Sequence, residues 1–240
     1  MKKQTILRAL ISIALVAAAV FATSAQVQHF NIKVGDFARL ALVDDINVCY
    51  RCNADSAGLV VFDATPEVAN AMIFSMSNNN RLAIQIDDNF ERQGHLPNLT
   101  IYSSTLDEAE NSGDSILRVE GLPAMKSFKV RLVDNGKVIL HHIRASQLEL
   151  QILSGKGKII ADGSCDDLSL KLVGTGEIQA DQVIATNVSC RIMGTGSMGC
   201  NVNGGLLKVS GSGTGKVYYK GNPSKVSVRK LGTIKAIPME

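Results

Sequence analysis

Apolar and polar residues alternate along the second half of the chain, and the alternation is centred on glycines that recur every 19 or 20 residues. These glycines are Gly136, Gly155, Gly174, Gly194, Gly213 and Gly232. The residues six and four places before a glycine, and four and six places after it, are apolar, as in Leu168, Leu170, Ile178 and Ala180. Polar residues lie between them. An alternation with a period of two predicts β-strands that bury one face.

Each repeat contains one strand, a Gly-Thr-Gly corner at residues 174–176, 194–196 or 213–215, and a second strand. A repeat of this length, with like residues at like positions, is typical of a stacked solenoid. We therefore predict an all-β fold, a right-handed single-stranded parallel β-helix with coils of about 19–20 residues. The right hand is favoured over the left because crossovers between parallel strands are right-handed. Leu148, Leu150 and Ile152 are one residue out of register, which predicts a bulge or a changed turn before Gly155.

Residues 1–25 have the pattern of a secretory signal peptide. Lys2, Lys3 and Arg8 precede an apolar run at residues 9–21, and small residues follow up to Ala25. The run is shorter than the roughly 20 residues of a membrane-spanning helix, so cleavage after Ala25 is favoured over a permanent anchor. We expect an exported protein with no membrane span after signal removal; the periplasm and the cell surface both remain open.

The mature chain is expected to be one domain at residues 26–240. Residues 126–240 hold the regular coils, and residues 26–125 hold irregular first coils and a cap, since terminal repeats of solenoids are atypical. Strands are predicted at residues 39–42, 46–52, 59–62, 82–86 and 99–102, with a turn at residues 78–80. A short helix is predicted to start at Pro66, capped by Thr65.

Charge excludes one class of partner. The whole chain has a formal net charge of +3, and residues 1–25 contribute three Lys/Arg and no Asp/Glu, so the mature chain is neutral. No general basic character remains that would predict nucleic-acid binding.

Several segments resemble one family of secreted proteins of Bacteroidota, the "putative auto-transporter adhesin" family with the head GIN domain. They are residues 96–103 (LPNLTIYS), residues 110–115 (ENSGDS), the Gly-Thr-Gly repeats and residues 216–223 (KVYYKGNP). The resemblance covers nearly all of the mature chain. It implies a right-handed β-helix of uncharacterised role, with no defined catalytic residues to transfer.

Asp162 and Asp181 each lie seven residues after a repeat glycine, as do Asn201 and Lys220, so the four are expected to stack at a second corner. Two stacked carboxylates could be the acid/base pair of a polysaccharide-acting enzyme. We favour a column of turn residues, because no His, Arg or Tyr is expected beside them and solenoid faces are expected to be convex without deep pockets. We therefore predict no catalytic residue.

Cysteine and histidine residues are also weak candidates for chemistry. Cys49 and Cys52 have the C-x-x-C spacing of redox pairs, but in a strand they would point to opposite faces. Cys190 and Cys200 are expected in the core as small apolar residues; Cys165 is unassigned, and disulfide pairing stays open for all five. His141 and His142 are expected to point to opposite faces and not to share a metal. We predict no metal and no cofactor.

A neutral, exported β-helix is suited to binding along its faces. We expect a non-enzymatic, adhesin-like protein of the envelope or cell surface that binds carbohydrate, an envelope polymer or a protein, on residues that the sequence does not identify. The alternatives are the enzyme that uses Asp162 and Asp181, and a purely structural envelope component. Homo-oligomers are conceivable, because the end coils of a parallel stack have unpaired strand edges.

Overall fold

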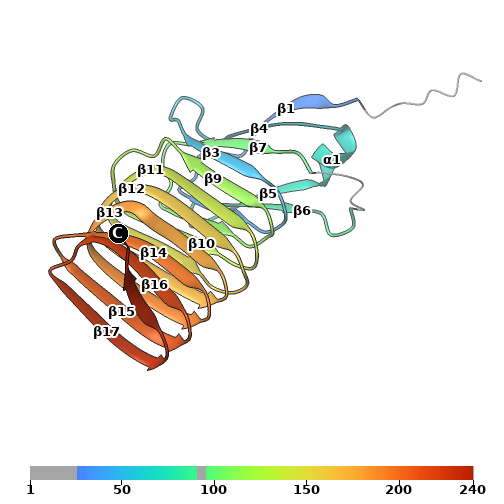
Figure 1. Cartoon of the computed structure of the whole chain (residues 1–240). Coiled ribbons are helices and arrows are strands. Elements are labelled where there is room, and N and C mark those ends of the chain that lie inside the picture. The colour runs from blue at the N-terminus through green and yellow to red at the C-terminus, as the bar shows by residue number, and fades with distance from the viewer. Residues whose placement is uncertain (1–25, 91–95, 240) are drawn as a thin grey trace, which may run out of the picture.

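The computed structural model describes residues 26–90 and 96–239, so the predicted signal peptide lies outside the described residues. The described chain forms one 18-stranded sheet that winds into a β-solenoid of about seven turns (Figure 1). The first part contains helix α1 (Pro66–Ala71) and strands β1 (Gln28–Lys33), β2 (Arg39–Leu42), β3 (Val48–Cys52), β4 (Leu59–Ala64), β5 (Met72–Ser77), β6 (Arg81–Ile86), β7 (Leu99–Ser103), β8 (Glu108–Asn111) and β9 (Ile116–Glu120). The second part contains strands β10 (Met125–Leu132), β11 (Lys137–Ile152), β12 (Lys158–Gly174), β13 (Glu177–Gly194), β14 (Ser197–Asn203), β15 (Leu206–Gly213), β16 (Lys216–Asn222), β17 (Lys225–Gly232) and β18 (Lys235–Pro238).

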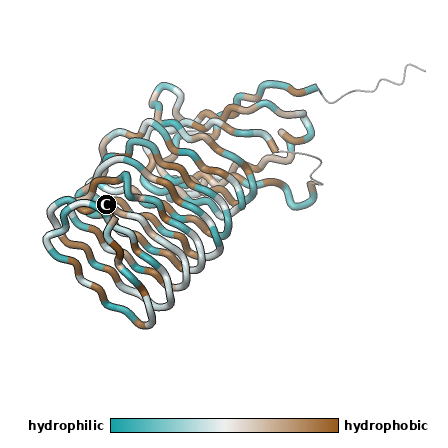
Figure 2. The backbone as a smooth tube through the Cα atoms, in the orientation of Figure 1, coloured by the Kyte–Doolittle hydropathy of each residue, from teal (hydrophilic) through white to brown (hydrophobic). Residues whose placement is uncertain are grey.

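The coils stack in parallel and in register, which confirms the predicted fold class. One core column runs through β11, β12, β13, β15 and β17 and consists of Leu150, Leu170, Cys190, Val209 and Val228. Its first four members are at most 1% exposed, and Val228 in the last coil is 41% exposed. Figure 2 shows the same alternation as brown and teal bands along each coil. Burial of one face of every strand therefore holds the stack together.

The glycine corners bring successive backbones too close together for a side chain. Gly194 has φ 137°, and a Cβ atom there would lie 2.1 Å from the carbonyl oxygen of Gly174. The N–H of Thr195 donates to that same oxygen at 3.1 Å. A φ of 137° together with a contact this short is tolerated only by glycine.

The predicted slip before Gly155 is a changed turn. Ile152 pairs with Leu172 and the N–H of Thr175 donates to the Gly155 carbonyl, so both coils are in register on either side of the corner. Gly155 follows Ile152 by three positions and Gly174 follows Leu172 by two. The coil with its corner at Gly155 therefore contains one more residue in its turn than the next coil, with its corner at Gly174.

The N-terminal end of the stack is covered by antiparallel elements. Strands β2 and β3 belong to the parallel stack, pairing with β8 and β9, whereas β1 pairs with β4 and β5 with β6 in antiparallel fashion. The predicted helix is present at Pro66–Ala71, and the Thr65 hydroxyl accepts a hydrogen bond from the N–H of Val68 at 3.4 Å. The predicted turn at residues 78–80 joins β5 to β6. A cap of different architecture thus closes this end, as expected for a terminal repeat.

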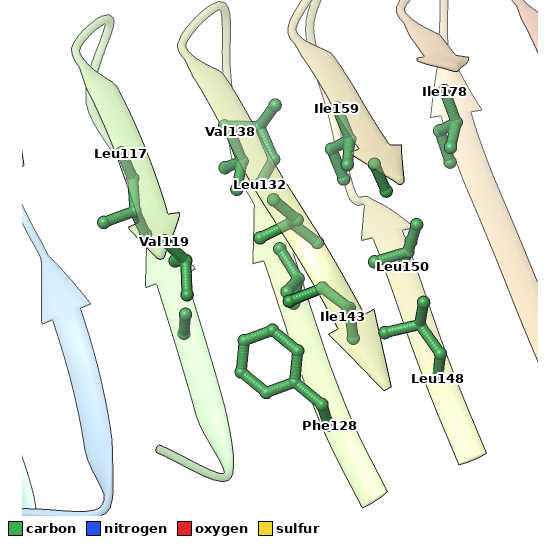
Figure 3. Packing of buried hydrophobic residues seen from close by; sticks show 14 of the residues in the cluster. Leu117, Val119, Phe128, Leu132, Val138, Ile143, Leu148, Leu150, Ile159 and Ile178 are labelled. Carbon is green, nitrogen blue, oxygen red and sulfur yellow. The ribbon is translucent and has the colours of Figure 1, made fainter. Parts of the chain in front are cut away.

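The core is continuous from the cap through the coils. Figure 3 shows Phe128, Leu148 and Leu150 packed between the walls with residues of neighbouring coils. In the cap, the rings of Phe30 and Phe62 stack with centroids 5.3 Å apart. No helix in the described ranges 26–90 and 96–239 has the length and apolar character needed to cross a membrane.

Candidate functional site

A groove of about 820 Å³ runs across the outer face of the coils, from the strand that follows the cap towards the C-terminal coils. It crosses β10, β11, β12, β13 and β15, and at about 4.8 Å per strand its length is about 20 Å. The expectation of convex faces without a deep pocket is therefore wrong. The buried residues Phe128, Leu148, Leu168 and Val188 lie beneath it, between two rows of outward side chains.

The first row, called here the polar row, consists of Ser127, Gln147, Asp167 and Asn187, which are paired in register on adjacent strands. The Asn187 side chain donates to Asp167 Oδ1 at 3.1 Å and accepts from the N–H of Leu206 at 3.1 Å. The row therefore presents hydroxyl, amide and carboxylate groups at regular spacing along the groove.

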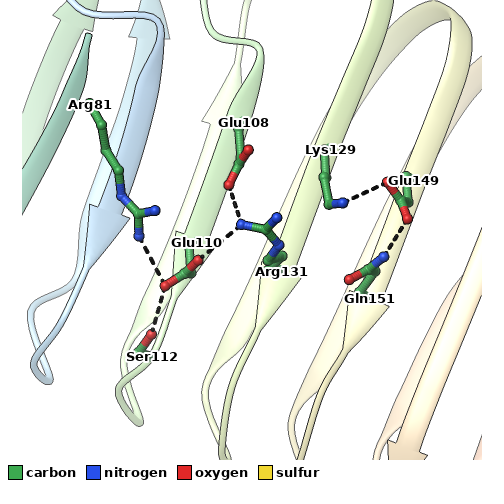
Figure 4. A network of polar contacts seen from close by, with 8 residues as sticks. All are labelled: Arg81, Glu108, Glu110, Ser112, Lys129, Arg131, Glu149 and Gln151. Carbon is green, nitrogen blue, oxygen red and sulfur yellow. Dashed lines mark hydrogen bonds and ion pairs between the residues drawn. The ribbon is translucent and has the colours of Figure 1, made fainter. Parts of the chain in front are cut away.

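The second row, called the mixed row, consists of Lys129, Glu149, Ser169, Ser189 and Lys208. Lys129 Nζ lies 3.0 Å from Glu149 Oε2, and the side chain of Gln151 donates to Glu149 (Figure 4). The first two side chains of the row are charged and form an ion pair, and the next two are serines with small hydroxyl side chains. The mixed row is thus uncharged at Ser169 and Ser189 and carries Lys208 at its far end, while Asp167 of the polar row places one carboxylate on the same strand as Ser169.

A polar network flanks the N-terminal end of the groove and links three strands. Arg131 on β10 is ion-paired with Glu108 and lies 3.4 Å from Glu110, and Glu110 accepts from Arg81 on β6 at 3.0 Å (Figure 4). The four side chains are between 18% and 30% exposed. Because each charge has a partner, this network is well suited to bracing the first coils against the cap.

The second corner holds Asp162, and the structure corrects two expectations there. His142 has φ 56°, and the β11 strand has two residues, His141 and His142, opposite the single Asp162 of β12. This bulge turns both histidines towards the carboxylate: His141 Nδ1 lies 2.9 Å from Asp162 Oδ2, and the N–H of His142 donates to Oδ1 at 2.6 Å. The histidines therefore do not point to opposite faces, and Asp162 does have histidines beside it.

The hydrogen bonds alter the acidity of this carboxyl. Burial of Asp162 tends to raise its pKa, but the bonds from the His142 N–H and the His141 ring outweigh burial, and the pKa lies below its ordinary value. An acid held in its charged form is a poor proton donor at neutral pH. In the described ranges 26–90 and 96–239, no three His, Cys, Asp or Glu side chains are grouped to hold a metal ion.

Asp162 and Asp181 do not form the expected column. Asp162 pairs in register with Gln182 rather than with Asp181, because the strands shift by one residue at this corner. Asp181 instead lies 3.4 Å from Lys220 Nζ and accepts from the Gln182 side chain at 3.0 Å. Neither carboxylate lines the groove. Of the expected column, Asn201 and Lys220 do pair in register.

The five cysteines are free thiols. Cys49 and Cys52 both lie in β3, as the sequence predicts, and are partly exposed. Cys190 and Cys200 are fully buried; a hydrogen bond with Cys200, together with burial, raises the pKa of Cys190 well above its ordinary value. Burial raises the pKa of Cys165 to about 12. The raised pKa values hold the thiols of Cys165 and Cys190 in the unreactive protonated form.

The comparisons place the chain among adhesin-like solenoids. A crystal structure described as a "putative adhesin" from Bacteroides fragilis NCTC 9343 has 20% identity and a TM-score of 0.79, with 90% of this chain and 98% of that chain covered. A "putative adhesin" from Parabacteroides merdae ATCC 43184 follows at 17% identity and 0.74, and a "putative lipid binding protein" from Parabacteroides distasonis ATCC 8503 at 16% and 0.72, both with the same coverage. At these identities the likeness concerns the fold.

No curated protein matches the sequence. The family model described as "Putative auto-transporter adhesin, head GIN domain" matches residues 36–223. The matched segment contains strands β2 to β16, the whole groove and all three Gly-Thr-Gly corners. The chain therefore belongs to the "Putative auto-transporter adhesin, head GIN domain" family.

Proposed function

We propose that this protein is a non-enzymatic binding protein of the cell envelope or cell surface, and that an extended polymer, a carbohydrate chain, lies in the groove. The carrying observation is the groove itself, whose two rows together place at least one hydroxyl or amide side chain on each of the four successive strands β10 to β13. A polymer with a regular repeat can meet a regular array of such groups with the same contacts in each unit. Hydroxyl and amide groups also match the donors and acceptors of sugars.

The environment of the carboxylates supports binding rather than catalysis. Glycoside hydrolysis needs two carboxyl groups that face each other across the substrate. In the groove, Glu108 is paired with Arg131, Glu149 with Lys129, and Asp167 accepts from Asn187. Asp162 and Asp181 are engaged with other partners outside the groove.

Family membership supports the cellular setting. The family carries an adhesin description, and the sequence of residues 1–25 predicts export. An exported binding protein with a polymer groove would attach either to the envelope of its own cell or to a glycan outside it. Two alternatives, a protein as the ligand and a purely structural role in the envelope, predict no glycan bound in this groove.

The test is a glycan array on purified residues 26–240, combined with an assay for released reducing sugar. We expect glycan binding without release. Ser189→Trp places a large ring in the groove and should weaken binding at least about tenfold, whereas Ser197→Trp, on β14 outside the groove, should bind like the parent.

Three results would overturn the proposal. Release of reducing ends by the parent would indicate an enzyme. Glycan binding that Ser189→Trp leaves intact would place the site elsewhere. Absence of any glycan ligand would favour the protein or structural alternatives.

A further inference from the structure

Charge is distributed very unevenly along the mature chain, although its sum is close to zero. Residues 26–181 contain 21 of the 22 Asp/Glu, and residues 182–239 contain none. Those same residues 182–239 contain eight Lys/Arg. Because successive coils stack in space, this difference in sequence becomes a basic C-terminal end of the solenoid. The neutral sum of the mature chain hides a local positive field.

The register between strands brings three of these cations together with Lys171 on one face. We call Lys171, Arg191, Lys208 and Arg229 the basic strip. Lys171 pairs directly with Arg191, and Arg191 continues through Ser210 to Arg229 in the same column. Lys208 stands in the next column and also lines the groove. The column from Lys171 to Arg229 spans three strand spacings, about 15 Å.

The strip has no counter-charges of its own. None of its four side chains makes a hydrogen bond or ion pair with any other residue of the described ranges. Further up the same column, Arg131 is paired with Glu108 and lies near Glu110. Like charges directly opposite each other on adjacent strands are destabilising, and Lys171 and Arg191 are such a pair. An anionic ligand would relieve this repulsion.

We propose that the groove and the basic strip form one site for an acidic polysaccharide. This inference rests on the proposed function: the groove receives the sugar rings, and the strip receives their carboxylate or sulfate groups. Arginine binds such planar or tetrahedral anions through paired N–H donors, which suits Arg191 and Arg229. Lys208 belongs to both surfaces, so a chain leaving the far end of the groove passes directly onto the strip.

The surroundings of the strip favour a polysaccharide over other anions. Ser169, Ser189, Ser210 and Ser227 lie between the cations on the same face. Single-stranded nucleic acid is bound by exposed aromatic rings on which bases stack, and the strip has none. An anionic membrane surface would also attract the cations, but the serines between them add hydroxyl donors and acceptors that match sugar groups and add no apolar surface for the lipid.

The test uses residues 26–240 with an oligogalacturonate and a neutral dextran oligomer of equal length, measured by calorimetry. The parent should bind the oligogalacturonate at least about tenfold more tightly than the neutral oligomer. The triple variant Arg191→Gln, Lys208→Gln, Arg229→Gln should lose at least about tenfold in affinity for the acidic oligomer. The matched control Lys216→Gln, Lys230→Gln, Lys235→Gln removes the same charge from the same coils off the strip, and should lose less than about threefold.

The outcomes separate this inference from the function on which it rests. Equal binding of both oligomers, blocked by Ser189→Trp, would keep the groove as a glycan site and reject the acidic ligand. Equal losses in both triple variants would reject the strip in favour of general charge attraction. Tighter binding of single-stranded DNA or of phosphatidylglycerol vesicles, lost in the strip variant, would assign the strip to a different partner. Oligogalacturonate binding that Ser189→Trp leaves intact would reject a shared site.

Discussion

The two ends of the solenoid differ in how their terminal coils are covered. At the N-terminal end, β1, β4, β5 and α1 cover the stack with antiparallel pairs and stacked aromatic rings. At the C-terminal end, β17 pairs with β15 and β18 with β16, and neither strand has a second sheet neighbour within the described ranges. Val228 is therefore exposed where Val209, one coil earlier, is buried. The same apolar position contributes to stability only where a further layer covers it.

The ends differ in electrostatics as well as in packing. Arg131 and Arg191 occupy the same outward column, three coils apart. Arg131 is held among carboxylates, whereas Arg191 makes no ion pair within the described ranges. A repeat thus keeps its core residues constant while its outward residues change role, from bracing the capped coils to presenting charge on the later ones.

The packing difference is tested most directly by placing a charge in the same core column twice, once in a middle coil and once in the last coil. Leu170→Asp buries an unpaired carboxylate and should destabilise the protein by about 4 kcal/mol. Val228→Asp, in the same column of the last coil, should cost about 1 kcal/mol or less because its side chain reaches water. Denaturant unfolding followed by circular dichroism measures both. Equal losses for the two variants would show that the end coil is as well covered as the middle.

The electrostatic difference predicts a smaller effect. Arg131→Met leaves Glu108 and Glu110 partly buried without their shared partner, and should cost about 2 kcal/mol once solvent screening of these half-buried groups is allowed for. Arg191→Met should change stability by less than about 0.5 kcal/mol. The comparison is made by thermal unfolding at low and high salt, where salt should reduce only the first effect. A larger loss for Arg191→Met would mean that this residue has a structural partner after all.

The smallest expected effect is a change in how the stability of the protein depends on pH in the acid range. Burial alone would raise the pKa of Asp162, but the hydrogen bonds from His142 and His141 hold it below the ordinary value. Such a carboxyl contributes stability that is fully present above its unfolded pKa, near about 4, and is lost as pH falls through the folded pKa. Asp162→Asn should therefore be slightly less stable than the parent above about pH 4 and approach the parent below it.

Unfolding midpoints of Asp162→Asn and the parent, measured across the acid range, check this prediction. A difference between the two midpoints that stays constant with pH would contradict it. Since 21 of the 22 acidic residues lie in residues 26–181, acid should weaken the N-terminal coils before the C-terminal ones. Glycan binding in the groove should be unchanged in Asp162→Asn, because this residue is not part of the groove wall.

Much of the fold could be predicted because burial in a solenoid repeats. The positions of Leu170, Ile178 and Val209 follow from an alternation that any stacked strand must show, and all three are buried as predicted. The helix at Pro66 follows from local rules for proline and threonine at a helix start. Strands β1, β5, β8 and β9 were not predicted, since they lie outside the regular repeat that would single them out.

The residues of the second corner show where local rules fail. The sequence does not mark His142 for a positive φ, because only a small minority of residues other than glycine adopt left-handed backbone, even among the histidines in which it is enriched. The resulting bulge decides that Asp162 contacts two histidines and pairs with Gln182. A shift of one residue changes every neighbour of a side chain in a sheet.

The sequence by itself determined the repeat, the inward columns, the glycine corners and the family, because each depends on residue type at a regular spacing. Only the tertiary structure decided the groove and the basic strip. A groove depends on how each coil bends, and bending depends on small differences in turns such as the one before Gly155. The strip depends on register between strands, which places Lys171 beside Arg191 and two further cations on the same face. Alternation reveals which way a side chain points; it does not reveal which side chains from other coils stand next to it.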